Sequence, residues 1–428
     1  MSYFTHVVRS KGFGNVLPRA LAIGRNFGFF SEERIEKKLR LLQAIMTRYS
    51  CPLTACVTAC LAERYPASVE AMVQRGWEIA AHGKVHCDFR RLPLEAQTAE
   101  LEEARRLYSD KGLAVTGFRA PYLAWNENTR TAAARTGFLW TSNQALLWPV
   151  FDRRDHSPRR WHSLELVLEH LYRPLRAERS VSIPQIREGV VEIPASLPDD
   201  EIPLDRLRIS EGMLQALWLR LLKESRGRGE LAVLLIHHER VPEFSSALKA
   251  VVRAARGRSG SLWLAGMGAI ARWWQERSGF RLDIERVGGR YRVEARCSPS
   301  GVVLVKDGGH RDWPLPGWRE IRARRFTLEA SARPTIGLVG QPAPAAAAFL
   351  RNEGFVVEPR QGEHAVMLEG FEDFGPEAER ALLGVVEAAR GPLLRFWRWP
   401  RGVKSALALS MDVDSMTLLD FAKRSLQR

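Results

Sequence analysis

Cysteine is scarce in this chain, and its spacing excludes the common cysteine-based scaffolds. The 428 residues include five cysteines, an odd number with no zinc-type double pair: Cys51, Cys56, Cys60, Cys87 and Cys297. Because disulfide frameworks and structural zinc sites need paired cysteines, we expect neither. Cys56 and Cys60 lie among apolar residues and are expected to pack rather than react. This usage is typical of a reducing compartment.

Long hydrophobic runs are also absent. No uninterrupted apolar stretch reaches the roughly 18 residues that a membrane helix needs. The first residues, MSYFTHVVRSKGFGNVLPRALAIG, lack the continuous apolar core of a secretion signal. From both observations we expect a cytoplasmic protein without a membrane span.

Acidic residues are outnumbered by basic ones. Asp plus Glu is 49 and Lys plus Arg is 64, which gives a formal charge of +15 and a pI near 10.0. Such a charge favours acidic partners: nucleic acid, an anionic membrane surface or a phosphorylated substrate. It is equally typical of an Arg-rich composition with no partner at all. No zinc finger, helix-turn-helix pair or aromatic RNA motif is present, so nucleic acid is not an expected partner.

Strands and helices alternate over most of the chain. Residues 32–49 carry apolar residues at helical spacing, and PLTACVTA, WEIAAHG, VTGFRAPY, GVVEIP and LAVLLIHHE are typical of buried strands. This alternation runs to about residue 276 and predicts a parallel sheet of the α/β class, open or closed into a barrel.

The pattern changes after Arg277. RLDIERVGGRYRVEAR alternates at period two around Gly288 and Gly289, which predicts a β-hairpin, and 333–400 is typical of a small α/β unit. The last segment predicts a buried strand followed by a helix. We therefore expect three units: 1–276 with 401–428, a β-rich segment 277–332, and 333–400. The middle two either bridge the ends of the first or cover a substrate cleft.

Three short motifs stand where strands end. HGKVH places His82 and His86 four residues apart, a spacing that brings two imidazoles to one metal if the backbone turns between them. GFRAPY offers Arg119, and LLIHH delivers His237 and His238. The ends of parallel strands are where α/β enzymes place reactive groups, although each motif alone also fits ordinary loop or structural residues.

In this order, the motifs resemble the NodB-homology polysaccharide deacetylases, carbohydrate esterase family 4. The resemblance covers about residues 30–276 and is strongest from EIAAHGKVHCDF through GFRAPYLAWN. It implies a distorted (β/α) barrel that uses a metal to remove N- or O-acyl groups from sugars.

The resemblance also implies an acidic motif on a first strand before the histidines, and no such strand precedes His82. SALALSMDVDS, at the other end of the chain, supplies Asp412 and Asp414. We therefore hypothesise a circularly permuted barrel, with 401–428 as its first strand and helix and 1–30 as their continuation. Two alternatives are a second, truncated catalytic domain and a surface acidic turn on an inactive fold.

By this resemblance, Asp414, His82 and His86 hold one divalent metal. Zinc suits two nitrogens and a carboxylate best, and cobalt, nickel or iron also fit. Asp412 is the expected base that takes a proton from water, and His237 the acid that protonates the leaving amine.

The loop after Arg119 completes the expected site. Arg119 orients the base, and the backbone N–H of Tyr122 stabilises the oxyanion. Pro121, Trp125 and His238 are expected to contact substrate, Trp125 by stacking on a sugar ring. Where the resemblance implies a carboxylate that tunes the acid, this chain reads FLWTSNQALLW and has none.

We expect the substrate to be an acylated sugar or a lipid- or nucleotide-linked glycan, with peripheral contact to an anionic membrane as a further option. Two alternatives remain open: an amidase of a non-sugar cyclic amide, and a catalytically inert binding scaffold. The sequence predicts no oligomeric state.

Overall fold

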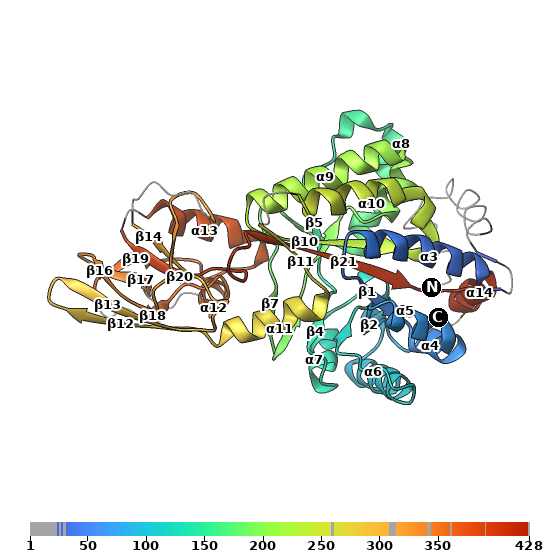
Figure 1. The fold of residues 1–428 in the computed structure, drawn as a ribbon, viewed down its shortest axis with the longest axis horizontal. Coiled ribbons are helices and arrows are strands. Elements are labelled where there is room, and N and C mark those ends of the chain that lie inside the picture. Colours follow the sequence, from blue (N-terminus) through green and yellow to red (C-terminus); the bar gives the residue numbers. More distant parts are fainter. Residues whose placement is uncertain are drawn as a thin grey trace.

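A curled, 12-stranded mixed sheet surrounded by helices forms the larger part of the computed structural model (Figure 1). The structure describes residues 24, 27–28, 31–257, 261–307, 314–339, 344–359, 362–389 and 391–426. Most of the predicted continuation through residues 1–30 therefore lies outside the described residues. The curled sheet and its helices confirm the expected distorted (β/α) barrel.

The strands of this sheet follow the order β6-β5-β9-β10-β21-β1-β2-β3-β4-β8-β7, with β11 paired to β21. Their bounds are β1 Thr54–Val57, β2 Glu78–Ala81, β3 Gly117–Phe118, β4 Trp140–Thr141, β5 Ala145–Leu147, β6 Leu175–Arg176, β7 Gln185–Arg187, β8 Val190–Glu192, β9 Ala195–Leu197, β10 Leu231–His237, β11 Leu262–Leu264 and β21 Ser405–Val413. Only the β7–β8 pair is antiparallel.

Strand β21, from the C-terminal end of the sequence, lies in the middle of the sheet. It pairs in parallel with β10 on one side and β1 on the other, and Asp412 stands opposite both His237 and Cys56. All nine of its residues are buried. Its continuous apolar run, SALALSM, is what a strand covered on both faces requires.

Helices pack their apolar faces on the outside of this sheet. The clearest case is α3, whose buried residues recur at helical spacing: Ile35, Leu39, Leu42, Ile45 and Met46. The bounds are α3 Glu33–Arg48, α4 Ala59–Arg64, α5 Pro66–Gln74, α6 Leu94–Ser109, α7 Glu127–Arg135, α8 Pro158–Val167, α9 Glu211–Gly227, α10 Val241–Ala255, α11 Met267–Ser278 and α14 Leu418–Leu426. No helix among the described residues combines the length and hydropathy needed to cross a bilayer.

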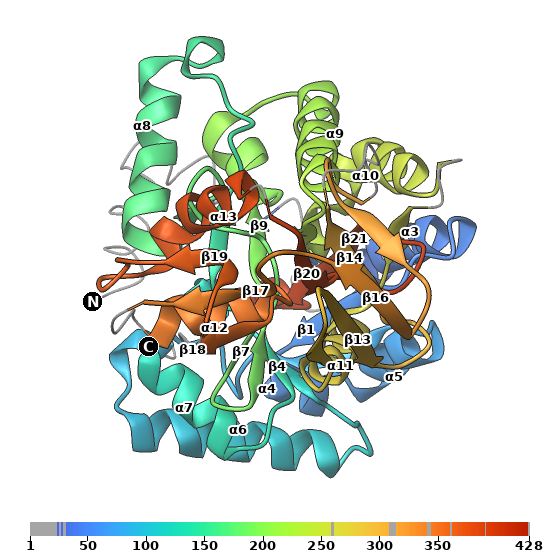
Figure 2. The same cartoon turned by 90° about the vertical axis from the view of Figure 1, so that its left-hand side faces the viewer.

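Residues 281–396 form an appended body of three small sheets and two helices (Figure 2). Its strands are β12 Arg281–Val287, β13 Arg290–Arg296, β14 Val303–Lys306, β15 Arg319–Ile321, β16 Arg325–Glu329, β17 Arg333–Leu338, β18 Val357–Pro359, β19 His364–Leu368 and β20 Leu393–Phe396, and its helices are α12 Pro344–Asn352 and α13 Glu379–Ala388. The predicted hairpin is β12–β13. Because β20 pairs with β14, the segments that the sequence divided at residue 332 share a sheet.

The appended body lies at the end of the barrel where the strands begin. Arg398 and Trp399 donate hydrogen bonds to the carbonyls of Arg228 and Gly229, just before β10. Strand β21 leads away from this contact (Figure 1), and its first seven residues, roughly 23 Å of extended chain, precede Asp412. Of the two expectations for residues 277–400, the structure favours a bridge between barrel segments over a cover for the opposite end.

Candidate metal centre

The two predicted histidines are brought together by a turn after β2. Gly83 has a φ of +79°, a left-handed conformation that glycine adopts without strain. The turn places the rings of His82 and His86 5.1 Å apart between centroids, and both side chains are buried. The sequence spacing therefore yields a pair of imidazoles facing one point.

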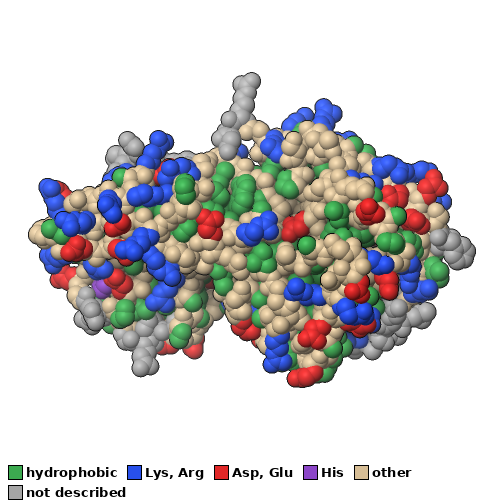
Figure 3. All heavy atoms as spheres, turned by 60° about the horizontal axis from the view of Figure 1, so that its bottom comes forward, with side chains coloured by type: hydrophobic (Ala, Val, Ile, Leu, Met, Phe, Trp, Pro, Cys, Tyr) green, Lys and Arg blue, Asp and Glu red, His purple; other side chains and the backbone are tan. Residues whose placement is uncertain are grey.

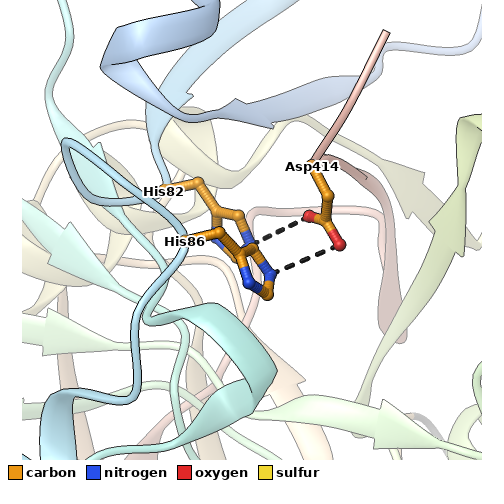
Figure 4. A group of neighbouring side chains, drawn as sticks. All are labelled: His82, His86 and Asp414. Atoms are coloured by element: carbon orange, nitrogen blue, oxygen red, sulfur yellow. Dashed lines mark ion pairs between the residues drawn. The ribbon is translucent and has the colours of Figure 1, made fainter. Parts of the chain in front are cut away.

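Asp414 reaches this point from the opposite end of the sequence (Figure 4). Nε2 of His82 lies 3.3 Å from Oδ1 of Asp414, and Nε2 of His86 lies 3.3 Å from Oδ2. These separations are compatible with one shared ion. The position follows from the register of β21, which ends beside β1, the neighbour of β2.

The residues present fit a divalent cation. Nδ1 of His82 lies 2.8 Å from the Arg119 carbonyl, which accepts its proton and leaves Nε2 as the ligating atom. That Nε2 is buried and has no hydrogen-bond partner within the described structure. The two 3.3 Å separations between imidazole Nε2 and carboxylate oxygen are close to the roughly 3.4 Å between neighbouring ligands of a tetrahedral ion with bonds of about 2.1 Å.

Asp412 lies beside this centre and is held from behind. Its Oδ1 accepts a 2.9 Å hydrogen bond from Nη1 of Arg119, while its Oδ2 lies 3.9 Å from Nε2 of His82. Arg119 is fully buried and also donates to Ser410 and Ser142. One carboxylate oxygen is thus fixed by the guanidinium and the other faces the metal centre.

The loop after Arg119 is held in an unusual backbone conformation. Tyr122 has a φ of 62° and its ring packs edge-on against His86, 4.3 Å between centroids. The N–H of Ala120 donates to Oδ1 of Asn143 at 2.7 Å. Pro121 is buried in this loop, and its contact with substrate stays a prediction. Asn143, from the segment without a carboxylate, thus supports the loop.

The carboxylate that the sequence seemed to lack comes from another strand. Oδ1 of Asp200 lies 2.6 Å from Nδ1 of His237, and Oδ2 accepts the His237 backbone N–H. Burial lowers the pKa of His237, but the charge and hydrogen bond of Asp200 outweigh it and raise the pKa to about 10. His237 is therefore protonated at neutral pH.

Asp200 was missed although the sequence contained a signal for it. It follows β9 in ASLPDD, and β9 pairs with β10, which carries His237. Asp199, Asp200 and His237 also have ligand atoms within 4.8 Å of one another. The short His237–Asp200 hydrogen bond already occupies that ring nitrogen, which favours a proton over a second metal there.

The predicted substrate contacts His238 and Trp125 lie in different surroundings. His238 is fully buried, with Nδ1 3.1 Å from the carbonyl of Asp412 and Nε2 2.7 Å from that of Ser415. Both ring nitrogens are thus engaged by carbonyls at the end of β21, and a contact between His238 and substrate stays a prediction. Trp125 lies under Arg130, 5.2 Å from guanidinium carbon to ring centroid, and lines a cavity of about 320 Å³. His82, His86 and Asp414 are not part of that lining, and a sugar-stacking role for Trp125 stays a prediction.

Residues 36–140 match the family model described as polysaccharide deacetylase. The matched segment contains His82, His86 and the Arg119–Tyr122 loop, and it confirms the resemblance drawn from the sequence. Asp412 and Asp414 lie outside it. No curated protein matches the chain.

Solved structures are similar to part of this chain. A protein of Mycobacterium smegmatis assigned to the polysaccharide deacetylases is 22% identical, with 55% of this chain and 76% of that chain covered and a TM-score of 0.43. A probable polysaccharide deacetylase from Pseudomonas aeruginosa PAO1 is 18% identical over 56% and 72%, with a TM-score of 0.44. The allantoinase Puue is 17% identical over 56% and 72%, with a TM-score of 0.42.

Proposed function

We propose that the chain is a metal-dependent hydrolase that removes an N-acyl group from a sugar, because its residues 36–140 match the polysaccharide deacetylase model. The observation that carries this proposal is the meeting of His82, His86 and Asp414, with 3.3 Å between each imidazole Nε2 and the carboxylate. Zinc suits the ligand set best. A bound divalent ion would polarise water and the acyl carbonyl oxygen.

The residues around the centre supply the proton transfers. Asp412 accepts a proton from water as the water oxygen attacks the acyl carbon, and Arg119 keeps that carboxylate oriented. His237, charged through its contact with Asp200, gives its proton to the sugar nitrogen as the carbon–nitrogen bond breaks. The backbone at Tyr122 is the expected donor to the oxyanion. These roles form one balanced hydrolysis, with acetate as the expected product.

The substrate is proposed from the family and the charge. An acylated sugar, free or linked to a nucleotide or lipid phosphate, suits a chain of +15. The appended body contacts the end of the barrel where the strands begin, and the proposed metal centre lies where they end. This arrangement supports a glycan approaching the metal centre from the side that the appended body does not cover.

Metal content tests this proposal. We expect about one zinc-like ion per chain by elemental analysis of the unaltered protein, and none in Asp414→Ala. Asp110→Ala, which removes an exposed carboxylate at the end of α6, is the matched control and should keep its ion. Acetate released from an N-acetylglucosamine oligomer should follow metal content. Retention of the ion by Asp414→Ala, or a metal-loaded chain that releases no acetate from any acylated sugar, would contradict the proposal.

A further inference from the structure

A cavity unrelated to the metal centre lies where α11 of the barrel meets the appended body. It measures about 400 Å³ and is lined by the end of α11, the start of β12, the 351–357 segment and β20. Its walls carry three arginines, Arg277, Arg281 and Arg351, and three phenylalanines, Phe280, Phe355 and Phe396. We call this cavity the junction pocket.

The three arginines of the junction pocket bond to backbone carbonyls rather than to carboxylates. Arg277 is almost wholly buried and donates to the carbonyls of Trp397 and Asn352 at 2.7 and 2.8 Å. Arg281 donates to two carbonyls nearby, and Arg351 to the carbonyl of Val357. Within the described chain, none of the three forms an ion pair, and no acidic side chain lines the pocket.

Glu353, a buried carboxylate whose charge acts on Arg277, is already engaged by other cations. Both oxygens of Glu353 accept hydrogen bonds from Arg398 at 2.9 Å, and Oε2 also accepts one from Arg395 at 2.5 Å. Burial, followed by the Arg395 charge, lowers the pKa of Arg277 to about 9, although Glu353 opposes this. The region therefore holds more positive than negative charge out of water, an arrangement that an anion would stabilise.

The floor of the junction pocket is formed by aromatic side chains that contact one another. The rings of Phe280 and Phe396 lie 5.3 Å apart between centroids. Gly354, with a φ of +95°, lets the chain pass so close to Phe396 and Arg277 that any Cβ would clash with both. A side chain at this position would therefore displace the Phe396 backbone or the Arg277 guanidinium, both of which are part of the wall.

We propose that the junction pocket binds a phosphate-bearing organic ligand, with the phosphate on the guanidinium groups and an apolar part against the phenylalanines. Guanidinium forks match phosphate oxygens in pairs, and several of them favour a dianion over a single carboxylate. On the face drawn in Figure 3, Lys and Arg side chains are interspersed with Asp and Glu. The proposal therefore depends on the lining of the pocket and not on the net charge, and it is independent of the hydrolase proposal.

Calorimetric titration with phenyl phosphate at fixed ionic strength tests the junction pocket. We expect saturable 1:1 binding that is at least about tenfold tighter than that of inorganic phosphate, since only phenyl phosphate also contacts the rings. Phenol alone should not bind. Equal affinities for phenyl phosphate and inorganic phosphate, or no saturation with either, would overturn the proposal.

Variants locate the binding. Arg281→Gln/Arg351→Gln, changed at two exposed side chains, should weaken phenyl phosphate binding at least about tenfold. Arg325→Gln, an exposed arginine on β16 of the same body, is the matched control and should bind as the unaltered protein does. Arg351→Gln alone, which should weaken binding by a smaller factor, serves if the double variant misfolds. Equal losses in Arg325→Gln would show non-specific charge attraction and overturn the assignment.

The ligand's source is separated by two further probes, adenosine monophosphate and a lysophosphatidic acid below its micellar concentration. Competition of either with phenyl phosphate supports the pocket and assigns it to nucleotides or lipids. Metal content should stay unchanged in the arginine variants, so a failure here is distinguishable from a failure of the hydrolase proposal.

Discussion

At the scale of single residues, Asp200 determines which form of His237 is present at neutral pH. The pKa of His237, about 10, lies above its ordinary 6.5, so the acid form persists up to that pH and is lost as pH rises through it. In Asp200→Asn the raising charge disappears while burial remains, so the pKa should fall below 6.5. We expect the alkaline limb of kcat/KM to move from about pH 10 to below 6.5, as measured in a pH–rate profile.

Two observations keep this prediction specific. Metal content should be unchanged in Asp200→Asn, because Asp200 contacts His237 and not the proposed ligands. Asp152→Asn, changed at an exposed carboxylate paired with Arg154, should leave the pH profile in place. An alkaline limb that stays near pH 10 in Asp200→Asn would mean that His237 is not the acid.

The role of Asp412 as general base can be tested with a substitution of the same shape. Asp412→Asn keeps the hydrogen-bonded shape beside Arg119 but cannot accept a proton from water. We expect kcat to fall by about 10²–10⁴-fold with the metal retained, since general base catalysis contributes that much. Elemental analysis and acetate release, measured on the same preparation, check both parts. Near-normal turnover would exclude Asp412 as the base.

Among the secondary-structure elements, the sequence predicts which segments are strands but not which strands pair. Buried strands such as β10 and β21 are continuous apolar runs, and the residues at their ends follow directly from that pattern. The pairing of strands does not, because it depends on contacts far apart in sequence. The Asp200–His237 contact needed the β9–β10 pair, and the burial of His238 depended on carbonyls at the end of β21, so both were beyond local patterns.

Strands β3 and β4 pack closely because Gly117 lies directly against the indole of Trp140. A Cβ on Gly117 would fall inside the indole of Trp140, so Gly117→Ala must displace a fully buried ring. We expect a loss of about 1–3 kcal/mol in the free energy of unfolding, from urea denaturation followed by tryptophan fluorescence. Gly384→Ala, in an exposed position of α13 with open space around it, should instead stabilise by up to about 1 kcal/mol. Equal effects at both positions would contradict this packing argument.

In the whole molecule, the proposed metal ligands come from distant parts of the sequence: His82 and His86 follow β2, and Asp414 follows β21. They meet only because the chain between α11 and β21 returns to the middle of the barrel sheet. The appended body occupies the interval between α11 and β21, and its Arg277, Glu353, Arg395 and Arg398 network joins it to the barrel. The appended body therefore connects α11 to β21, which lies between β10 and β1 in the sheet. The hypothesis of a displaced first strand came from Asp412 and Asp414, which matched a motif missing before His82. The sheet that β14 and β20 share across residue 332 could not be predicted, because no hydrophobic periodicity marks it.

The permutation hypothesis can be tested by reordering the chain. A protein that runs 401–428 and then 1–400 keeps every residue but places Asp412 and Asp414 before His82, as the family resemblance implies. Among the described residues the two terminal regions already meet, since Leu418 donates a hydrogen bond to the Gly28 carbonyl and Phe27 lies 6.2 Å from Phe421 between ring centroids. The new ends open the exposed turn that precedes β21.

We expect this reordered protein to bind one metal per chain and to keep kcat/KM within about tenfold, because every contact of the barrel is preserved while only the loop-closure entropy changes. The same reordered chain with Asp414→Ala is the control, and it should bind no metal. If the reordered protein has the circular dichroism of the original yet binds no metal, the permutation hypothesis is contradicted, because the reordered strands do not assemble the metal centre. If it binds metal in spite of Asp414→Ala, the centre is completed by residues other than those proposed.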